Sequence, residues 1–172
     1  MLLRNAADYL ERSAARVPDK TAFSDASGAV SYRWMLHDAQ ALGTVLAAVP
    51  GCCNAPVAVM IGRTVKSLTA MQGVLQSGNY YVPLDEQMPE ARMRRILDQV
   101  HARAIVYTEP NRAAAEKLAD CAPLVSLEEA AAHEPDPALL HARREEILDI
   151  DPVYVLFTSG STGAPKGIVI SH

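Results

Sequence analysis

Residues 158–167 carry the side chains best suited to chemistry on an anion. The segment reads T-S-G-S-T-G-A-P-K-G and holds three glycines, four hydroxyl side chains and one lysine. Glycine lets the backbone come close to a ligand, and successive backbone N–H groups form a concavity that binds anions. Hydroxyl groups donate hydrogen bonds to phosphate oxygens, and Lys166 adds a positive charge. The segment therefore predicts a polyphosphate-binding loop, with ATP as the favoured ligand.

Spacing excludes two well-known phosphate-binding patterns. The Walker pattern needs a second glycine five positions after the first, followed by lysine and then serine or threonine. Here Pro165 stands five positions after Gly160, and Gly167 follows Lys166. The dinucleotide pattern G-x-G-x-x-G is also absent, because the glycines of the segment are spaced too far apart.

The flanks of the segment favour a loop between two strands. Residues 153–157 and 168–170 are apolar and rich in β-branched side chains. A Walker loop opens a helix instead, so the flanks also argue against that pattern. A Gly/Ser linker that binds nothing is the plain alternative, but a linker needs neither the Pro165–Lys166 pair nor a strand on each side.

Together with Tyr154 and Phe157, the segment resembles the phosphate-binding motif of the adenylate-forming enzymes. This superfamily includes peptide-synthetase adenylation domains, acyl- and aryl-CoA ligases and luciferases. The chain meets the pattern Y-x-x-[FY]-T-S-G-S-T-G-x-P-K-G in full. Residues 75–85 resemble a second family segment, L-x-x-G-x-A-Y-V-P-L-D, with Tyr80 in place of the usual alanine. We expect this change to alter local packing only.

A third and weaker match lies at residues 30–35, which align with the family pattern L-[TS]-Y-x-E-L. Ser31 and a glutamate three positions later would form a reciprocal capping box at the start of a helix. Trp34 replaces that glutamate. We therefore expect Ser31 to cap the helix alone.

The resemblance implies a reaction in two steps. A carboxylate attacks the α-phosphate of ATP and gives an acyl-adenylate and pyrophosphate, and a thiol of a carrier protein or of CoA then takes the acyl group. The match at residues 81–85 leans toward an amino acid as the carboxylate. Magnesium would share in neutralising the phosphates, but no metal ligand and no catalytic residue is identified in this chain. The residues implied to hold the β- and γ-phosphates are Thr158, Ser159, Gly160, Ser161, Thr162, Gly163 and Lys166.

The resemblance further implies that residues 1–172 form the N-terminal part of an AMP-binding domain, without the rest of the core and the C-terminal subdomain. We expect the isolated chain to be inactive in adenylation. A non-catalytic binding module and one half of a split enzyme are the alternatives. An unrelated nucleotide hydrolase is disfavoured, because no magnesium-binding acid follows the loop.

Composition narrows the class of protein. The net charge is −4 and the hydrophobic fraction is 49%, which is typical of a globular protein and too high for disorder. Basic residues are scattered, so we expect no nucleic-acid partner and no membrane partner. The uncharged residues 39–62 are interrupted by Pro50 and Pro56, which argues against a membrane span. Three cysteines without disulfide or zinc spacing indicate a reduced, cytoplasmic setting.

The order of expected elements predicts an α/β fold. From residue 57 onward strands and helices alternate, which favours a mostly parallel sheet flanked by helices, ending in a β-hairpin that carries the phosphate loop. We expect strands at 57–61, 80–84, 104–107 and 124–126, and helices at 67–76, 90–101 and 111–119. Ser67 is the expected cap of the first of these helices. Upstream we expect helices at 5–15 and 32–48 and short strands at 21–23 and 29–32. Residues 128–149 are predicted to form a surface excursion with one helical piece near 138–146.

Three other groups of polar residues are given structural roles. Asp85 is expected to cap the turn before Pro89 rather than to act as a functional carboxylate. The five histidines are far apart in sequence, and His172 receives no catalytic role. Cys53 is interpreted as a structural cysteine rather than a nucleophile.

Overall fold

A computed structural model describes residues 5–159 and 165–172. Its main feature is a six-stranded sheet in the order β6-β5-β3-β4-β7-β8, accompanied by a separate two-stranded sheet. The strands are β1 Thr21–Asp25, β2 Gly28–Ser31, β3 Pro56–Ile61, β4 Tyr80–Asp85, β5 Ala104–Tyr107, β6 Leu124–Ser126, β7 Pro152–Ser159 and β8 Pro165–Ser171. The helices are α1 Ala6–Arg16, α2 Tyr32–Ala47, α3 Val65–Gln76, α4 Glu90–Val100, α5 Arg112–Glu116, α6 Leu127–Ala130 and α7 Pro137–Glu145, with a 3₁₀ turn at Glu109–Asn111.

The centre of the sheet is parallel, as the alternation of elements predicts. β3 pairs with β4 on one side and with β5 on the other, and β5 pairs with β6, all in parallel. The five residues Pro56 to Met60 of β3 are buried, which explains why this strand is apolar throughout rather than alternating. β7 continues the parallel arrangement next to β4, and β8 turns back antiparallel.

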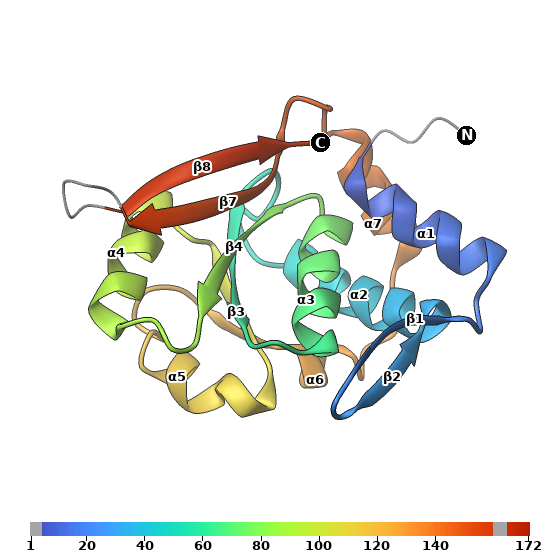
Figure 1. Cartoon of the computed structure of the whole chain (residues 1–172). Coiled ribbons are helices and arrows are strands. Elements are labelled where there is room, and N and C mark those ends of the chain that lie inside the picture. Colours follow the sequence, from blue (N-terminus) through green and yellow to red (C-terminus); the bar gives the residue numbers. More distant parts are fainter. Residues whose placement is uncertain (1–4, 160–164) are drawn as a thin grey trace.

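Helices cover both faces of this sheet (Figure 1). On one face, α2 and α3 pack over β3 and β5 through a buried cluster that includes Leu42, Val59 and Val74. On the other face, α4 and the segment around α5 pack through Met60, Ile96 and Leu118. The α/β class and the flanking layers are therefore confirmed.

Two helix starts test the expected caps. Ser31 caps α2 alone by accepting a hydrogen bond from the Trp34 N–H at 3.5 Å, as expected. For α3 the expected cap is wrong, because the helix begins at Val65 and Thr64 is its cap. The Thr64 hydroxyl accepts from the Ser67 N–H at 3.3 Å, while the Ser67 hydroxyl accepts from the Gly62 N–H. The two hydroxyl residues stand three positions apart, and the one further upstream takes the capping position.

The segment after β5 departs from the expected elements in two places. The helix expected at 111–119 is a 3₁₀ turn followed by the short α5. Residues 128–149 are not only a surface excursion, because most of α6 falls within them and α7 buries Leu140 and Arg144 against the helices beneath. In the described part of the chain, no helix has the length and apolar character needed to cross a membrane.

Candidate functional site

The β7–β8 hairpin carries the described residues of the predicted phosphate loop. Thr158 and Lys166 are direct partners across the hairpin, and Ser159 and Pro165 form the next pair toward the tip. Directly opposed residues of an antiparallel pair project on the same face. The hairpin therefore sets the Thr158 hydroxyl and the Lys166 ammonium side by side at the mouth of the loop. Gly160, Ser161, Thr162 and Gly163, which the sequence also predicts as phosphate-binding residues, lie outside the described residues.

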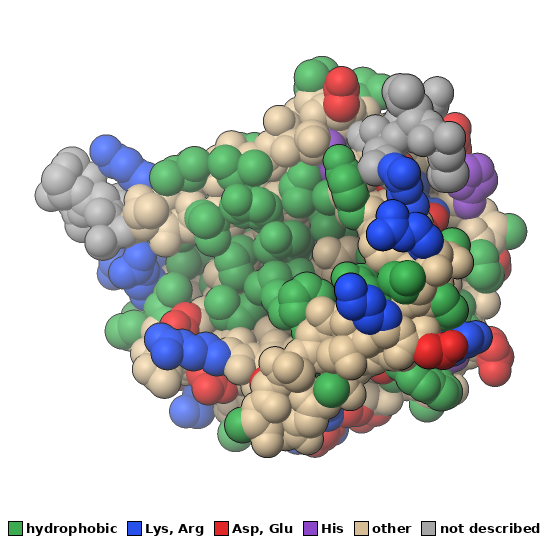
Figure 2. Space-filling view, turned by 45° about the vertical axis from the view of Figure 1, so that its right-hand side comes forward, with side chains coloured by type: hydrophobic (Ala, Val, Ile, Leu, Met, Phe, Trp, Pro, Cys, Tyr) green, Lys and Arg blue, Asp and Glu red, His purple; other side chains and the backbone are tan. Residues whose placement is uncertain are grey.

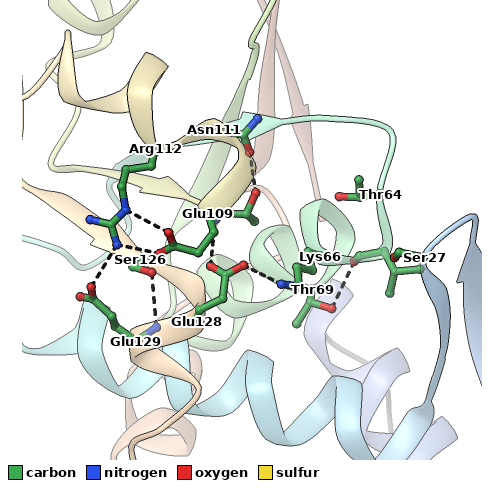
Figure 3. A network of polar contacts seen from close by, with 12 residues as sticks. Ser27, Thr64, Lys66, Thr69, Glu109, Asn111, Arg112, Ser126, Glu128 and Glu129 are labelled. Carbon is green, nitrogen blue, oxygen red and sulfur yellow. Dashed lines mark hydrogen bonds and ion pairs between the residues drawn. The ribbon is translucent and has the colours of Figure 1, made fainter.

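Lys166 is available for a ligand. Its side chain is exposed, and no ion-pair partner for it is found among the described residues. The contrast is Lys66 at the start of α3, whose ammonium lies 2.7 Å from the Glu128 carboxylate. Figure 3 shows Lys66 within a network in which Glu128 also accepts from the Glu109 N–H, and Arg112 contacts Glu109 and Glu129. The cations of that network are already neutralised by carboxylates.

Gly167 lies in close contact with side chains of the opposite strand of the hairpin. A Cβ atom at this position would lie 3.1 Å from the Val155 side chain and 3.2 Å from the ring of Phe157. Phe157 and Gly167 are direct partners across the hairpin. The sequence interpretation credits the glycines with close approach to a ligand, whereas this one makes room for an aromatic ring. No sequence signal distinguishes the two uses of glycine.

The two tyrosines of the matching motifs anchor the hairpin to the sheet. Tyr81 of β4 pairs with Tyr154 of β7, and their rings stack with centroids 5.4 Å apart. Burial raises the pKa of Tyr81, and the neighbouring Tyr154 adds to that effect. Tyr80, the departure from the family pattern, is half-buried against the opposite face of the sheet, so its effect is on packing as expected.

The other end of the hairpin is tied to the first helix. The His172 ring accepts a hydrogen bond at Nδ1 from the Ala6 N–H, with 2.9 Å between the nitrogens. The backbone N–H of His172 donates to the Asp151 carbonyl at 3.2 Å. Burial lowers the pKa of His172, against the opposing effect of Asp151 and Asp8. The sequence predicts solvated or capping roles for the histidines and no catalytic role for His172. It does not identify the helix that His172 caps, because the partner lies 166 positions away.

One face of the hairpin is apolar and exposed. Leu156 and Ile168 oppose one another, as do Tyr154 and Ile170. Leu156 is 43% exposed, Ile168 50% and Ile170 39%. Figure 2 shows hydrophobic side chains gathered broadly over this side of the molecule. Isolated exposed leucines are common, but a contiguous apolar surface of this kind marks a contact with other polypeptide or with a ligand.

Among the described residues we find no cluster of metal ligands, and neither Cys52 nor Cys53 has the surroundings of a reactive cysteine. No group of three histidine, cysteine or acidic side chains among them is placed to hold a metal ion. All three cysteines are free. Burial raises the pKa of Cys52 to about 11, which disfavours the thiolate. The Cys53 thiol donates to the Glu146 carboxylate, with 3.5 Å between sulfur and oxygen.

Asp85 adopts the expected structural role. Its carboxylate accepts from the Gln87 N–H at 2.9 Å and so closes the turn after β4. The Asp85 carboxylate therefore accepts a hydrogen bond from the backbone of the turn that follows it.

The family of the chain follows from comparison with known proteins. The model of the family described as AMP-binding enzyme matches residues 10–172. The chain belongs to this family. Its members are adenylate-forming ligases that use ATP and magnesium. The described hairpin fits that chemistry, because it presents a cation and a hydroxyl group where the loop begins.

Curated relatives include multidomain peptide synthetases. Pyochelin synthetase PchF of Pseudomonas aeruginosa is 38% identical over 167 residues, which is 97% of this chain and 9% of that protein. Surfactin synthase subunit 1 of Bacillus subtilis is 35% identical over 83% of this chain and 4% of its own length. The AMP-binding chain therefore spans a small part of the relatives that it matches.

Solved structures agree on the fold. The N-terminal subdomain of Klebsiella oxytoca NpsA, in complex with 3-hydroxybenzoyl-AMSN, superposes with a TM-score of 0.77 at 22% identity. That match covers 99% of this chain and 41% of the solved subdomain chain. The N-terminal domain of FACL13 from Mycobacterium tuberculosis gives a TM-score of 0.80 at 22% identity, with 99% and 45% covered. The fold is thus that of a part of the N-terminal subdomain of adenylate-forming enzymes, since the chain spans less than half of these two solved chains.

Proposed function

We propose that the chain forms the first part of an adenylation domain that activates an amino acid as its acyl-adenylate, with release of pyrophosphate. The observation that carries this proposal is the hairpin of an AMP-binding family member that sets Thr158 opposite Lys166, a lysine without an ion-pair partner among residues 5–159 and 165–172. In this function the loop of residues 158–166 holds the β- and γ-phosphates of ATP. Residues 1–172 are then a partial domain.

The chemistry of adenylation explains why such a loop is needed. Attack on the α-phosphate requires the departing pyrophosphate to be held in line and its charge to be neutralised. Lys166 supplies a charge, and Thr158 supplies a hydroxyl donor next to it. Magnesium supplies further neutralisation when bound, and the described residues offer no cluster of ligands for it. We therefore propose that the metal ligand lies in another part of the enzyme.

The relatives favour an amino acid and a carrier-bound thiol. The curated matches include peptide synthetases. Among the structural neighbours, FmoA3 holds α-methyl-L-serine-AMP and VinN holds L-aspartate. These ligands belong to those proteins, and they support amino-acid activation here because the fold is shared. A carrier-protein thiol as the acceptor follows from the same class of relatives, with CoA as the other thiol to test.

The phosphate-binding role is tested by titrating MgATP and pyrophosphate into the 172-residue chain. The Lys166→Ala variant is compared with Lys66→Ala, which removes a lysine already paired with Glu128. A charged hydrogen bond contributes about 1.5–3 kcal/mol, so we expect Lys166→Ala to weaken binding about tenfold or more. Lys66→Ala should bind as the parent does. Equal affinities in the parent and the Lys166→Ala variant would refute the role of the loop.

The absence of catalysis by the chain alone is tested separately by pyrophosphate exchange with a mixture of amino acids. We expect no exchange above that of the Lys166→Ala variant. Exchange clearly above this background would show that these residues already contain the catalytic apparatus. It would also overturn the proposal that the domain is partial.

The exposed face of the hairpin favours a second candidate function, binding to a complementary polypeptide as one half of a split enzyme. Leu156, Ile168 and Ile170 form this face, and its apolar character suits a protein partner. The test measures self-association and the binding of a hydrophobic dye to Ile168→Asp, with Ile150→Asp as control, because Ile150 is 77% exposed elsewhere. Loss of association and dye binding in Ile168→Asp alone supports an interaction face. Equal behaviour of both variants argues against it.

A further inference from the structure

The side chain of His172 completes the N-terminus of a helix at the opposite end of the sequence. Ala6 is the first residue of α1, and the first N–H groups of a helix have no partner within it. The Asn5 side chain accepts a hydrogen bond from the Asp8 N–H. The Asp8 carboxylate accepts one from the Asn5 N–H, so the two residues form a capping box. The Ala6 N–H is satisfied by Nδ1 of His172. A strand end therefore supplies one acceptor that the helix lacks.

This hydrogen bond requires a neutral imidazole. Nδ1 can accept only when it carries no proton, so the proton of the neutral ring is on Nε2. Protonation would turn Nδ1 into a donor that faces the Ala6 N–H. It would also place a positive charge at the positive end of the helix dipole of α1. The contact is thus present in one protonation state and lost in the other.

Charged groups from three elements face the ring. Asp8 comes from α1, Asp151 from the segment before β7, and Arg144 from α7, where it lines the same narrow cavity. The two carboxylates favour the protonated ring, and both are already occupied. Asp8 accepts from the Asn5 N–H, and Asp151 accepts from the Leu148 N–H at 2.8 Å. Burial opposes the carboxylates and prevails, so the pKa of His172 lies below its ordinary value.

The contact lies at the base of the hairpin, where the register between β7 and the parallel part of the sheet is short. Among the described residues, Tyr81 and Tyr154 are the one pair in register between β4 and β7. His172 follows the last residue of β8, and its bond to Ala6 fixes that end against α1. Lys166 lies six residues away along the strand, or about 20 Å at the rise of an extended chain. The strands of the hairpin run from this base to the end that carries Lys166 (Figure 1).

We propose that His172 is a positioning residue whose neutral ring locks the hairpin to α1 and whose protonation releases it, so that binding of a polyphosphate at the loop depends on pH through this residue. We call the hydrogen bond between the neutral His172 ring and the Ala6 N–H the lock, and its existence does not depend on the proposed function of the loop. The effect of the lock on polyphosphate binding does rest on that proposed function. The lock and the loop are therefore tested by different measurements on the same variants.

The lock is tested in the full chain by amide hydrogen exchange, expressed as protection factors from pH 8 down to the lowest pH at which the chain stays folded, because the pKa of His172 is lowered. His172→Asn places an amide oxygen where Nδ1 stands and accepts at every pH, whereas His172→Gln places it one carbon further out. His172→Ala removes the acceptor. One hydrogen bond corresponds to about fivefold in protection. We expect the parent to lose about this factor at Ala6 and in β8 as the pH falls, and His172→Asn to keep its protection throughout.

His172→Gln and His172→Ala should show the low protection at every pH. Either of two results would overturn the lock: parental protection in His172→Ala at pH 8, or the same loss with falling pH in His172→Asn as in the parent. A ¹⁵N spectrum of the parent ring at pH 8 adds a direct check. It should show the proton on Nε2, and a proton on Nδ1 would contradict the assignment.

The coupling to the loop is tested by pyrophosphate affinity at pH 7.5 and at the lowest pH at which the chain stays folded, because the pKa of His172 lies below its ordinary value. Affinities are taken relative to His172→Asn so that titration of the ligand cancels. The parent should match His172→Asn at pH 7.5 and bind severalfold more weakly at the low pH, and His172→Ala should bind weakly at both. Parental affinity in His172→Ala refutes the coupling. If pyrophosphate binds none of the variants while the exchange pattern appears, the function proposed for the loop fails and the lock stands.

Discussion

Tyr154 stacks on Tyr81 across the junction between the parallel sheet and the antiparallel hairpin, with ring planes 23° apart. Both residues belong to segments whose sequence matches the family, and neither hydroxyl group is needed for the stack. The pair therefore has a structural function in holding β7 to β4. It accounts for two aromatic positions that the sequence alone presents only as part of a motif.

The stack predicts a graded response to substitution at Tyr154. Tyr154→Phe keeps the ring and should change the free energy of unfolding by less than about 0.5 kcal/mol, because the ring contact is retained. Tyr154→Leu keeps apolar volume but loses the ring pair, which contributes about 0.5–1.5 kcal/mol beyond area. Urea unfolding of both variants measures the difference. Equal stability of the Phe and Leu variants would show that the ring geometry contributes nothing.

Gly167 provides a second prediction at the hairpin. In Gly167→Ala the new methyl group meets Val155 and Phe157 at 3.1–3.2 Å, so we expect a loss of about 1–3 kcal/mol from overpacking. Gly62→Ala is the matched control, since its methyl group would have only ordinary contacts at 3.8–3.9 Å. Thermal unfolding measures both. Adding Phe157→Leu to Gly167→Ala should restore part of the loss, and no rescue would contradict the packing explanation.

Sequence patterns predict this fold wherever the deciding information is local. The buried run of β3 and the apolar flanks of the hairpin indicate strands because each is apolar over its own length. The assignment of Ser67 as a cap is wrong because two hydroxyl residues three positions apart give the same signal. The four residues of α6 are too few for helical periodicity to be recognised.

The parts of the candidate site that the sequence does not predict depend on distant contacts. Gly167 is fixed by the ring of Phe157 on the opposite strand, and His172 by an amide at the other terminus of the chain. A sequence motif specifies which residue type stands at such a position, but it does not specify which distant residue that side chain contacts. The roles of Thr158 and Lys166 at the mouth of the loop stay a prediction, supported by their placement opposite one another.

A buried polar cluster among four helices leads to a third prediction. Arg144 of α7 is 8% exposed and contacts the Glu11 carboxylate of α1 at 2.7 Å and the Gln76 amide of α3. Gln40 of α2 donates to the same carboxylate at 3.3 Å. Removing one member of a buried pair leaves the other charge without a partner, at a cost of about 3–5 kcal/mol. Because the Glu11 side chain is 25% exposed, we expect about 2–4 kcal/mol for Arg144→Met.

The control for this cluster is an exposed ion pair. Arg33 and Asp19 are in contact, with side chains 58% and 81% exposed. Such a pair contributes about 0–1 kcal/mol, so Arg33→Met should change stability little. Urea unfolding at pH 7 measures both variants. If Glu11→Leu combined with Arg144→Met is as stable as the parent, the penalty of the single variant comes from the unpaired charge. A cost for the double variant as large as for Arg144→Met would instead assign the loss to packing.

Asp25 leads to the fourth prediction, because it joins the small sheet to the start of α3. Its carboxylate accepts from the Ser27 hydroxyl at 2.5 Å, from the Ser27 N–H at 2.7 Å and from the Val65 N–H at 2.8 Å. These bonds, with the Ser27 hydroxyl first, lower the pKa of Asp25 from 3.8 to about 2. A carboxyl group with a lowered pKa binds fewer protons in the folded state. Its contribution to stability is therefore present above pH 3.8 and is lost as the pH falls toward 2.

Asp25→Asn should remove this dependence, since the amide does not titrate. Its single oxygen can keep the bonds from Ser27 or the bond from Val65 but not both, so we expect a lower stability above pH 4 as well. We expect the melting temperature of the parent to fall more steeply between pH 4 and pH 2 than that of Asp25→Asn, as measured by circular dichroism at matched ionic strength. Asp19→Asn is the matched control, because that aspartate lies at the surface in an exposed pair with Arg33. If Asp25→Asn and Asp19→Asn reduce the pH dependence of the melting temperature equally, the dependence comes from net charge. A slope lost only in Asp25→Asn places it in the contact between β1 and the first turn of α3.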